Sequence, residues 1–264
     1  MSPREILALF DEERRTLGLA GYRLEQTERL TRSIPLAGGW GWIAWSAHEP
    51  AEMDHAMDAE IAYFESLGCN FEWKVYDHDQ PADLRQRLAA RGFKIGPVEA
   101  FLVLPTHDLE ARADPGSGSI AVRRMNTIAE FEDYLAVERI VWPEDGAALP
   151  VDSRLRFLEY PDEASYYVGY VEGKPVACAR LDCRPGSHFA GLFGGSTLDE
   201  FRGHGLYTAL VAARGAEARE RGVEILCVDA LPTSRPILER RGFRCISQTY
   251  PCTWAVDPDA APGA

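Results

Sequence analysis

The sequence lacks the features that mark nucleic-acid-binding and membrane proteins. It contains no basic tract, and its 28 lysine and arginine residues are outnumbered by 41 aspartate and glutamate residues, which gives a formal net charge of −13. Affinity for nucleic acid rests largely on neutralised phosphates, so this balance argues against a nucleic-acid partner. No apolar run approaches the roughly 20 residues that span a bilayer, so we expect no membrane segment.

Signals for secretion, disulfide bonds and metal binding are also missing. The N-terminus reads Ser2-Pro3-Arg4-Glu5, which is typical of a helix start with serine as N-cap and not of a secretory signal. The six cysteines form no C-x-x-C pair, and the six histidines are scattered without ligand spacing. We therefore expect reduced thiols in a cytoplasmic protein without a metal site.

The composition that is present belongs to an ordinary globular protein. Hydrophobic residues make up 46% and charged residues 26% of the 264 positions, enough for one large domain or two modest ones. The stretch 105–119 is polar and ends in proline, glycine and serine, which is typical of a linker. We predict a first domain over 1–105, a linker over 106–119 and a second domain over 120–264. The acidic surface keeps the protein soluble or attracts a cationic substrate such as an amine.

Hydrophobic periodicity in the second domain predicts the order β-α-α-β-β-β-α-β-α-β-β, which is an α/β arrangement. Its last helix covers 234–241, and two closing strands cover 244–250 and 253–256. The first domain repeats part of this order in weaker form. Its predicted strands and helices alternate, at 39–46, 51–67, 71–76, 82–91 and 98–104.

One short segment occurs twice in the chain. Residues 88–93 (LAARGF) match residues 238–243 (LERRGF), and a strand is expected after each copy. The order of the surrounding elements also agrees between the two domains. We therefore interpret the two domains as a duplication.

The most informative segment, over 194–208, is a strand that runs into a turn with two glycines and then into a helix. Glycine lets the backbone approach a ligand closely, and the first N–H groups of a helix have no partner within it. These N–H groups and the positive end of the helix dipole suit a phosphate or pyrophosphate. The segment therefore predicts an anion site around Gly203 and Gly205.

Two other phosphate-binding motifs fit this segment less well. A dinucleotide-binding fold has three glycines directly after the first strand and an acidic residue about 20 positions later. Here the turn follows the fourth strand of its domain, and no third glycine stands in place. A P-loop would need Gly-Lys-Ser/Thr, which does not follow the turn. A dinucleotide-dependent enzyme is therefore a lower-ranked alternative.

Residues 195–208, 224–229 and 234–243 together resemble the GNAT superfamily of N-acetyltransferases. That family carries Arg/Gln-x-x-Gly-x-Gly/Ala between its fourth strand and third helix, and the turn here begins Arg202-Gly203-His204-Gly205. The last motif position is Tyr207 instead of glycine or alanine. The resemblance covers about 119–256, and it implies a fold of two GNAT-like mixed-sheet domains in tandem, the first incomplete.

The resemblance also implies which residues bind the coenzyme. The N–H groups of the turn would hold the pyrophosphate of acetyl-CoA, and the splayed fourth strand would pair with the pantetheine arm. Ser234 would either reach the pantetheine region or cap the last helix. The implied coenzyme-binding residues are Gly195, Ser196, Thr197, Arg202, Gly203, His204, Gly205, Leu206, Tyr207, Thr208 and Ser234.

The first domain lacks such a turn. Between its strand and helix stand residues 46–52 (SAHEPAE), which include two carboxylates and a proline but no glycine. Because these carboxylates would repel a pyrophosphate, we expect this domain to have kept the scaffold and lost the coenzyme. It then provides a wall for the acceptor site or a surface for a homodimer.

Catalytic side chains are harder to assign from the resemblance. In the family, a tyrosine acts as general acid at the position held here by Leu238, and a glutamate stands on the fourth strand at the position of Gly191. By family position, the N–H of Thr197 is the oxyanion donor. For acid–base roles we select Tyr250 and Glu144, and the remaining candidates are Asp145, Asp182 and His188.

Together these features predict an acyl-CoA-dependent N-acyltransferase. The reaction would move an acetyl group from acetyl-CoA to a primary amine of a small molecule or peptide by direct attack. Because the usual tyrosine and glutamate are missing, an acyl-CoA-binding regulator or pseudoenzyme without turnover is the alternative.

Overall fold

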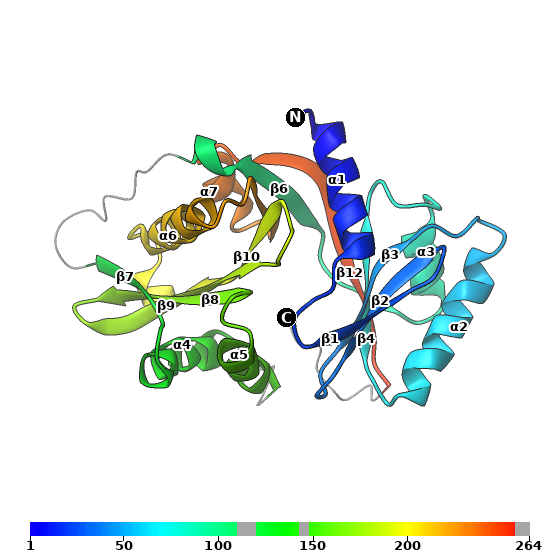
Figure 1. Cartoon of the computed structure of the whole chain (residues 1–264), viewed down its shortest axis with the longest axis horizontal. Helices are drawn as coiled ribbons and strands as arrows, with labels where there is room; N and C mark the ends of the chain where they lie inside the picture. Colours follow the sequence, from blue (N-terminus) through cyan, green and yellow to red (C-terminus); the bar gives the residue numbers. More distant parts are fainter. Residues whose placement is uncertain (110–119, 143–147, 257–264) are drawn as a thin grey trace. The chain divides into compact units, whose positions relative to one another are not determined.

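The computed structural model describes residues 1–109, 120–142 and 148–256. They form two compact units, drawn in Figure 1. Unit 1 contains Met1–Phe101, Asp229–Pro232 and the described residues from Cys245 onward, and unit 2 contains the described residues of Leu102–Val228 together with Thr233–Arg244. The mixed α/β class expected from the sequence is confirmed. The units differ from the predicted domains, because the last strand joins the unit that holds the N-terminus.

Unit 1 is built on a sheet with the strand order β1-β2-β3-β4-β12. Strands β3 and β4 pair in parallel, and the other neighbours pair antiparallel. The next strand in the order, β6, begins in unit 1 and continues into unit 2. The elements are α1 (Pro3–Thr16), β1 (Tyr22–Gln26), β2 (Leu30–Pro35), β3 (Gly41–Ser46), α2 (Met53–Ser66), β4 (Phe71–Tyr76), α3 (Leu84–Ala90), β5 (Lys94–Ile95), β6 (Glu99–Pro105) and β12 (Arg244–Trp254).

The first helix begins where its sequence predicts. The Ser2 hydroxyl accepts a hydrogen bond from the N–H of Glu5 at 3.3 Å, and the Glu5 carboxylate accepts one from the N–H of Ser2 at 2.6 Å. With Pro3 in the first turn, this capping box satisfies N–H groups that the helix itself leaves without acceptors.

Strand β4 separates an apolar face of unit 1 from a charged one. Phe71, Trp73 and Val75 are buried in a hydrophobic cluster with side chains of α2 and α3. Because side chains alternate along a strand, Glu72 and Lys74 lie on the opposite face. There the Lys74 ammonium lies 2.7 Å from the Glu99 carboxylate, 3.2 Å from that of Asp229 and 3.9 Å from that of Glu72.

This charged cluster makes the stability of the protein depend on the ionisation of Glu72. Burial raises the pKa of the Glu72 carboxyl to about 7; Lys74 opposes the rise, and Glu99 and Asp229 add to it. An acid whose pKa is raised by folding favours the folded state while protonated, so stability is lost as the pH rises from the unfolded value near 4.5 through 7.

We therefore expect Glu72→Gln to raise the free energy of unfolding by about 2 kcal/mol at pH 8 and to change it little at pH 5. Urea unfolding at the two pH values measures this difference. Glu65→Gln, at an exposed position of α2, is the matched control and should change neither value. Equal stability of Glu72→Gln and wild type at pH 8 would contradict the expectation.

Unit 2 carries the larger part of the mixed sheet, with the strand order β6-β11-β10-β9-β8-β7. Strand β10 pairs in parallel with β11 and antiparallel with β9. In Figure 1, α4 and α5 lie on one side of the strands β8 and β9, and α6 lies on the other. The elements are the 3-10 helices η1 (Thr106–Asp108) and η3 (Asp199–Phe201), the strands β7 (Ile120–Arg124), β8 (Ala164–Val171), β9 (Lys174–Cys183), β10 (Phe189–Thr197) and β11 (Ile225–Ala230), and the helices α4 (Ile128–Val141), α5 (Ala148–Glu159), α6 (Leu206–Glu220) and α7 (Arg235–Glu239).

Each unit contains the same succession of strand, helix, parallel strand and short helix. Strands β3 and β4 pair over three residues, as do β10 and β11. The repeated segment follows in both units: Gly92 and Gly242 end the short helices with φ of 93° and 91°, and the next residues, Phe93 and Phe243, are buried. A positive φ is the left-handed conformation that glycine adopts readily, which explains why the sequence keeps glycine at both positions.

The observed elements differ from the predicted ones at both ends of the chain. The structure has strands β1 and β2, which were not predicted, and the two expected closing strands form one strand, β12. Residues 110–119 of the expected linker lie outside the described residues. Among the described residues, no helix is both long and apolar enough to cross a membrane.

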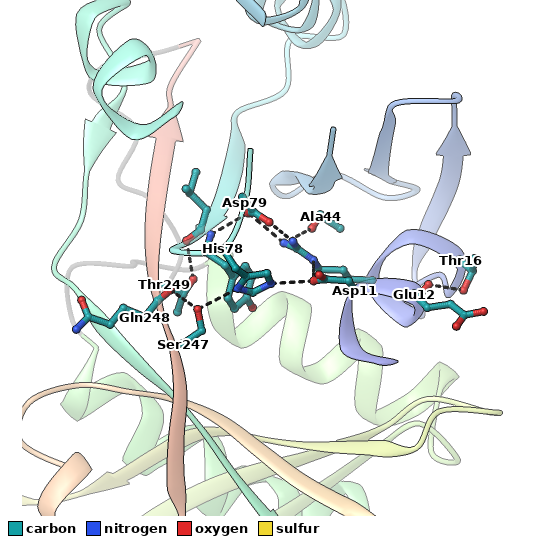
Figure 2. A network of polar contacts seen from close by, with 12 residues as sticks. Asp11, Glu12, Thr16, Ala44, His78, Asp79, Ser247, Gln248 and Thr249 are labelled. Carbon is teal, nitrogen blue, oxygen red and sulfur yellow. Dashed lines mark hydrogen bonds and ion pairs between the residues drawn. The ribbon is translucent and has the colours of Figure 1, made fainter. Parts of the chain in front are cut away.

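An ion-pair network ties α1 to the sheet of unit 1 (Figure 2). The Arg14 guanidinium donates two hydrogen bonds to the Asp79 carboxylate and one to Asp11, and both Arg14 and Asp79 are buried. The His78 ring bridges Asp11 and Ser247 at 3.0 Å to each. Asp11, His78 and Asp79 lie close enough to share a cation. Arg14 already supplies that positive charge, so we interpret the group as structural.

Candidate functional site

The central feature of unit 2 is that β10 and β11 separate. They pair from Phe189 to Gly191 only, although β10 continues to Thr197 and β11 to Ala230. On the side of β9, strand β10 carries a bulge. Phe193 pairs with Arg180 and Ser196 with Cys178, so three residue steps along β10 lie opposite two along β9. Gly194, at the bulge, has a φ of 58°, and its neighbours Phe193 and Gly195 are exposed. The splay therefore presents open backbone to a ligand.

Beyond the splay, the chain forms the glycine turn that opens α6. Gly203 and Gly205 have φ of 80° and 87°, and a side chain built on either would meet no atom within 4 Å. The first hydrogen bond of α6 runs from the N–H of Ala209 to the carbonyl of Gly205 at 2.9 Å. The N–H groups from Leu206 to Thr208 precede it and have no acceptor within the helix. The turn is thus an open, donor-rich helix N-terminus.

The polar side chains of the turn are exposed and are held by the turn itself. Arg202 forms an ion pair with Asp199 at 2.8 Å and donates to the Thr197 carbonyl at 3.2 Å. The Nδ1 atom of His204 lies 3.2 Å from the Phe201 carbonyl oxygen. These contacts fix the shape of the turn and leave its backbone N–H groups accessible.

Tyr207 and Ser234 lie together behind the splayed strand. Burial raises the pKa of Tyr207, and Arg214 and a hydrogen bond with the Ser234 side chain oppose the rise. Ser234 makes no capping hydrogen bond with its side chain at α7, so its side chain does not take the capping role expected as one alternative. A Cβ added to Gly195 would lie 2.8 Å from the Tyr207 ring, so glycine is needed for this close packing.

Arg214 of α6 supports the bulge from beneath. It is 1% exposed, and its Nη1 donates to the carbonyls of Phe193 at 3.2 Å and Arg180 at 2.9 Å. Phe193 and its partner Arg180 are the last pair before the bulge, and Arg214 donates to the carbonyls of both. The guanidinium therefore holds the splayed backbone in place.

Residues 131–243 match the model of the family described as "Acetyltransferase (GNAT) family". The match runs from α4 through the turn to the residue after Gly242. The chain contains a domain of the acetyltransferase (GNAT) family. No curated protein matches the sequence.

Solved structures with the same fold cover both units of the chain. A GCN5-related N-acetyltransferase from Kribbella flavida is 18% identical, with a TM-score of 0.72 over 98% of this chain and 96% of that chain. A functionally unknown conserved protein from Staphylococcus epidermidis ATCC 12228 is 17% identical, with a TM-score of 0.66 over 90% and 96%. A tandem GNAT protein from the clavulanic acid biosynthesis pathway is 16% identical, with a TM-score of 0.57 over 97% and 95%. At these identities the likeness concerns the fold alone.

The GNAT domain does not bring all the predicted catalytic residues to the splay. Thr197 lies on β10, and its hydroxyl oxygen is buried without a hydrogen-bond partner. Tyr250 belongs to unit 1, where its ring lies under Arg85 and its hydroxyl donates to Gln248 at 3.0 Å. Glu144 and Asp145 lie outside the described residues. The roles selected for these residues stay predictions.

The other candidates of the GNAT domain have structural partners. Burial would raise the pKa of Asp182, but Arg156 and Arg180 outweigh it and hold the pKa low. The carboxylate accepts from these two arginines at 3.2 and 2.8 Å. His188 directly precedes β10, and its carbonyl accepts from the N–H of Ile225.

The structure also explains the two missing family residues. A Cβ on Gly191 would lie 2.3 Å from the Phe193 ring, so this ring fills the place of a side chain at the family's glutamate position. Leu238, at the family's tyrosine position, is fully buried. Sequence reasoning missed Tyr134, Phe193 and Arg214, since each lies within an ordinary helix or strand pattern that carries no local signal for a site.

Proposed function

We propose that the protein is an acyl-CoA-dependent N-acyltransferase that moves an acetyl group from acetyl-CoA to a primary amine of a small molecule or peptide. The observation that carries this proposal is the glycine turn at the end of a splayed, bulged strand. The N–H groups from Gly203 to Thr208 suit a pyrophosphate, and the backbone of Gly195–Thr197 suits the amides of a pantetheine arm. Acetyl-CoA contains both groups in this order.

The residues present fit such a ligand. Gly194 and Gly195 expose backbone at the bulge, and the buried hydroxyl of Thr197 has no partner of its own. A buried polar atom without a partner costs about 1–3 kcal/mol, which a bound ligand with a matching group would offset. The coenzyme-binding set expected from the sequence, with Ser234 beside Tyr207, therefore remains the proposed one.

The reaction needs little acid–base chemistry. The amine nitrogen attacks the thioester carbon, donors around the bulge stabilise the oxyanion, and the thiolate leaves. Since Phe193 fills the space at Gly191, the ammonium proton would depart through water or through a group outside the described residues, such as Glu144. The formal charge of −13 favours a cationic acceptor.

Unit 1 has the features expected of a degenerate copy of the same domain. Where unit 2 has the turn, unit 1 has residues 46–52, and the Glu49 carbonyl accepts from the N–H groups of Glu52 and Met53. Glu52 itself pairs with Arg29 at 2.5 Å. The helix start is thus closed by its own chain and lined by carboxylates. We propose that unit 1 does not bind the coenzyme and serves the acceptor site or a homodimer, in a cytoplasmic protein.

A thiol-release assay across a panel of primary amines tests the function. We expect thiol release from acetyl-CoA with at least one primary amine and none with its tertiary analogue, which cannot form a neutral amide. Mass spectrometry of the product should show one added acetyl group. Thermal stabilisation by acetyl-CoA without release on any acceptor would instead favour an acyl-CoA-binding regulator, for which the missing tyrosine and glutamate argue. Stabilisation by NAD and not by coenzyme A would contradict both the transferase and the acyl-CoA-binding regulator.

A further inference from the structure

Tyr134 of α4 is a buried tyrosine whose hydroxyl is unused by the protein. Its side chain is 1% exposed and is held between the rings of Phe131 and Tyr166, at centroid distances of 5.3 and 4.9 Å. Within the described part of the chain, its hydroxyl makes no hydrogen bond. The oxygen is not among the buried side-chain atoms that lack a partner in the described residues, so the hydroxyl keeps some access to solvent and a ligand at the splay can reach it.

The hydroxyl points to the bulge of the splayed strand. A Cβ added to Gly194 would lie 3.4 Å from the Tyr134 oxygen, so that any larger residue would stand in front of the hydroxyl. Gly194 has a positive φ and lies within the bulge, and the Tyr134 hydroxyl is the group nearest to it from α4. A ligand that pairs with β10 therefore passes the hydroxyl at Gly194.

A second donor faces the neighbouring residue from the opposite side of the sheet. The Nη2 atom of Arg214 lies 3.6 Å from a Cβ built on Gly195 and makes none of the hydrogen bonds of that guanidinium. The two donors therefore lie on opposite faces of the strand. Arg214 supports the backbone from the side of α6, and Tyr134 is the donor that faces Gly194 from the side of α4.

We propose that Tyr134 is a catalytic residue whose hydroxyl donates a hydrogen bond to the sulfur of the reacting thioester, a role that rests on the proposed function. In acetyl-CoA the pantetheine arm separates the pyrophosphate from the thioester. With the pyrophosphate at the turn and the arm along β10, the sulfur lies at the end of the strand segment farthest from the turn. Gly194 and Tyr134 are at that end.

The step balances without a further reactant. The amine lone pair forms the C–N bond, and the carbonyl π electrons move to oxygen. When the carbonyl re-forms, the C–S bond breaks, its electron pair stays on sulfur, and the Tyr134 hydroxyl donates to this thiolate. The proton of the attacking ammonium leaves to water. The thiolate is a weak base, since a free thiol has a pKa of about 8.5.

Tyr134 acts as a donor and keeps its proton. Burial raises its pKa well above the ordinary value; Cys178 and Glu138 raise it further, Arg180 opposes the rise, and Tyr166 adds to it. Arg214 is the remaining charged group near the bulge. Transfer of the proton to a thiolate is unfavourable with such a pKa, whereas a hydrogen bond to the thiolate is favourable.

Tyr134→Phe tests the role, with Tyr170→Phe as the matched control. Tyr170 is also buried in the same unit, but its hydroxyl donates to Asp133 at 2.7 Å. We expect Tyr134→Phe to lower kcat 10- to 100-fold with little change in the KM for acetyl-CoA, and to leave the melting temperature unchanged or higher. Tyr170→Phe should lower the melting temperature and leave kcat unchanged. A wild-type kcat in Tyr134→Phe, or a lowered melting temperature, would overturn the role.

A second measurement needs no acceptor and separates this inference from the proposed function. Coenzyme A is titrated into wild type and Tyr134→Phe by calorimetry at pH 6 and pH 9. At pH 9, where the thiolate predominates, wild type should bind coenzyme A about tenfold more tightly than Tyr134→Phe does. At pH 6 the two proteins should bind it equally. Equal affinity at pH 9 would refute the contact with sulfur even if the enzyme is active. Tighter binding at pH 9 without turnover on any amine would keep the contact and refute the transferase.

Discussion

An aspartate at Gly203 is expected to weaken acetyl-CoA binding at least about 100-fold. The position has room for a side chain, because a Cβ there would meet no atom within 4 Å. Its carboxylate would stand beside the N–H groups that precede the first hydrogen bond of α6, where the pyrophosphate is proposed to bind. Juxtaposed like charges cost several kcal/mol, and each 1.4 kcal/mol is about tenfold in affinity. Calorimetric titration with acetyl-CoA measures the loss.

Two further variants separate charge from backbone strain. Gly203→Ala introduces the strain of a side chain at a φ of 80° without the charge, and we expect it to weaken binding less than tenfold. Gly186→Asp places the same residue at a φ of 77° with the same open space, between β9 and β10 and away from the turn. It should leave the affinity unchanged. If Gly203→Ala or Gly186→Asp weakened binding as much as Gly203→Asp, the pyrophosphate would not lie at the turn.

Unit 1 has carboxylates at the place that corresponds to this turn. Its strands β3 and β4 pair over three residues, as β10 and β11 do, so the splay is common to both units. The difference is local to the turn, where Glu49 and Glu52 replace the glycines. If the turn of unit 2 binds the pyrophosphate as proposed, this one short segment would account for the loss of the anion site in unit 1 while the surrounding fold persists.

The parts of the site that could be predicted from the sequence are those specified locally. Gly203, Gly205 and Gly242 adopt positive φ, so each marks its turn in the sequence as well as in the structure. The helix that follows the first turn needs no distant partner to present its N–H groups. The same holds for the capping box at Ser2, which the sequence located correctly.

The parts that were missed depend on contacts between distant segments. Tyr134 fits an ordinary amphipathic helix, and only the packing of α4 on β10 brings its hydroxyl to Gly194. Arg214 lies on the buried side of α6, and only the packing of this helix on the sheet brings it to the carbonyls of Arg180 and Phe193. Likewise, the periodicity of β12 predicts a strand but not its partner β4, which lies about 170 residues earlier in the chain.

The largest loss of stability is expected from Asp79→Ala in unit 1. Arg14 and Asp79 are 5% and 8% exposed, and their paired hydrogen bonds link α1 to the loop after β4. Arg14 also donates to the Ala44 carbonyl at 3.2 Å and lies 4.7 Å above the Tyr76 ring. Removal of the carboxylate leaves a buried guanidinium with Asp11 as its remaining anion, which should cost about 3–5 kcal/mol of unfolding free energy. Urea unfolding of the full chain measures it.

Two comparisons decide whether the loss of unfolding free energy in Asp79→Ala comes from the unpaired charge of Arg14. Asp83→Ala removes an anion from the half-exposed pair of Arg87, which keeps Asp54 as a partner at 3.0 Å, and should cost less than about 0.5 kcal/mol. Arg14→Met combined with Asp79→Leu removes both charges together. Because replacing a whole buried pair by apolar residues is often neutral, this double variant should recover most of the stability that Asp79→Ala loses. A double variant as unstable as Asp79→Ala would show that the hydrogen-bonded geometry between α1 and the sheet, and not the unpaired charge, supports unit 1.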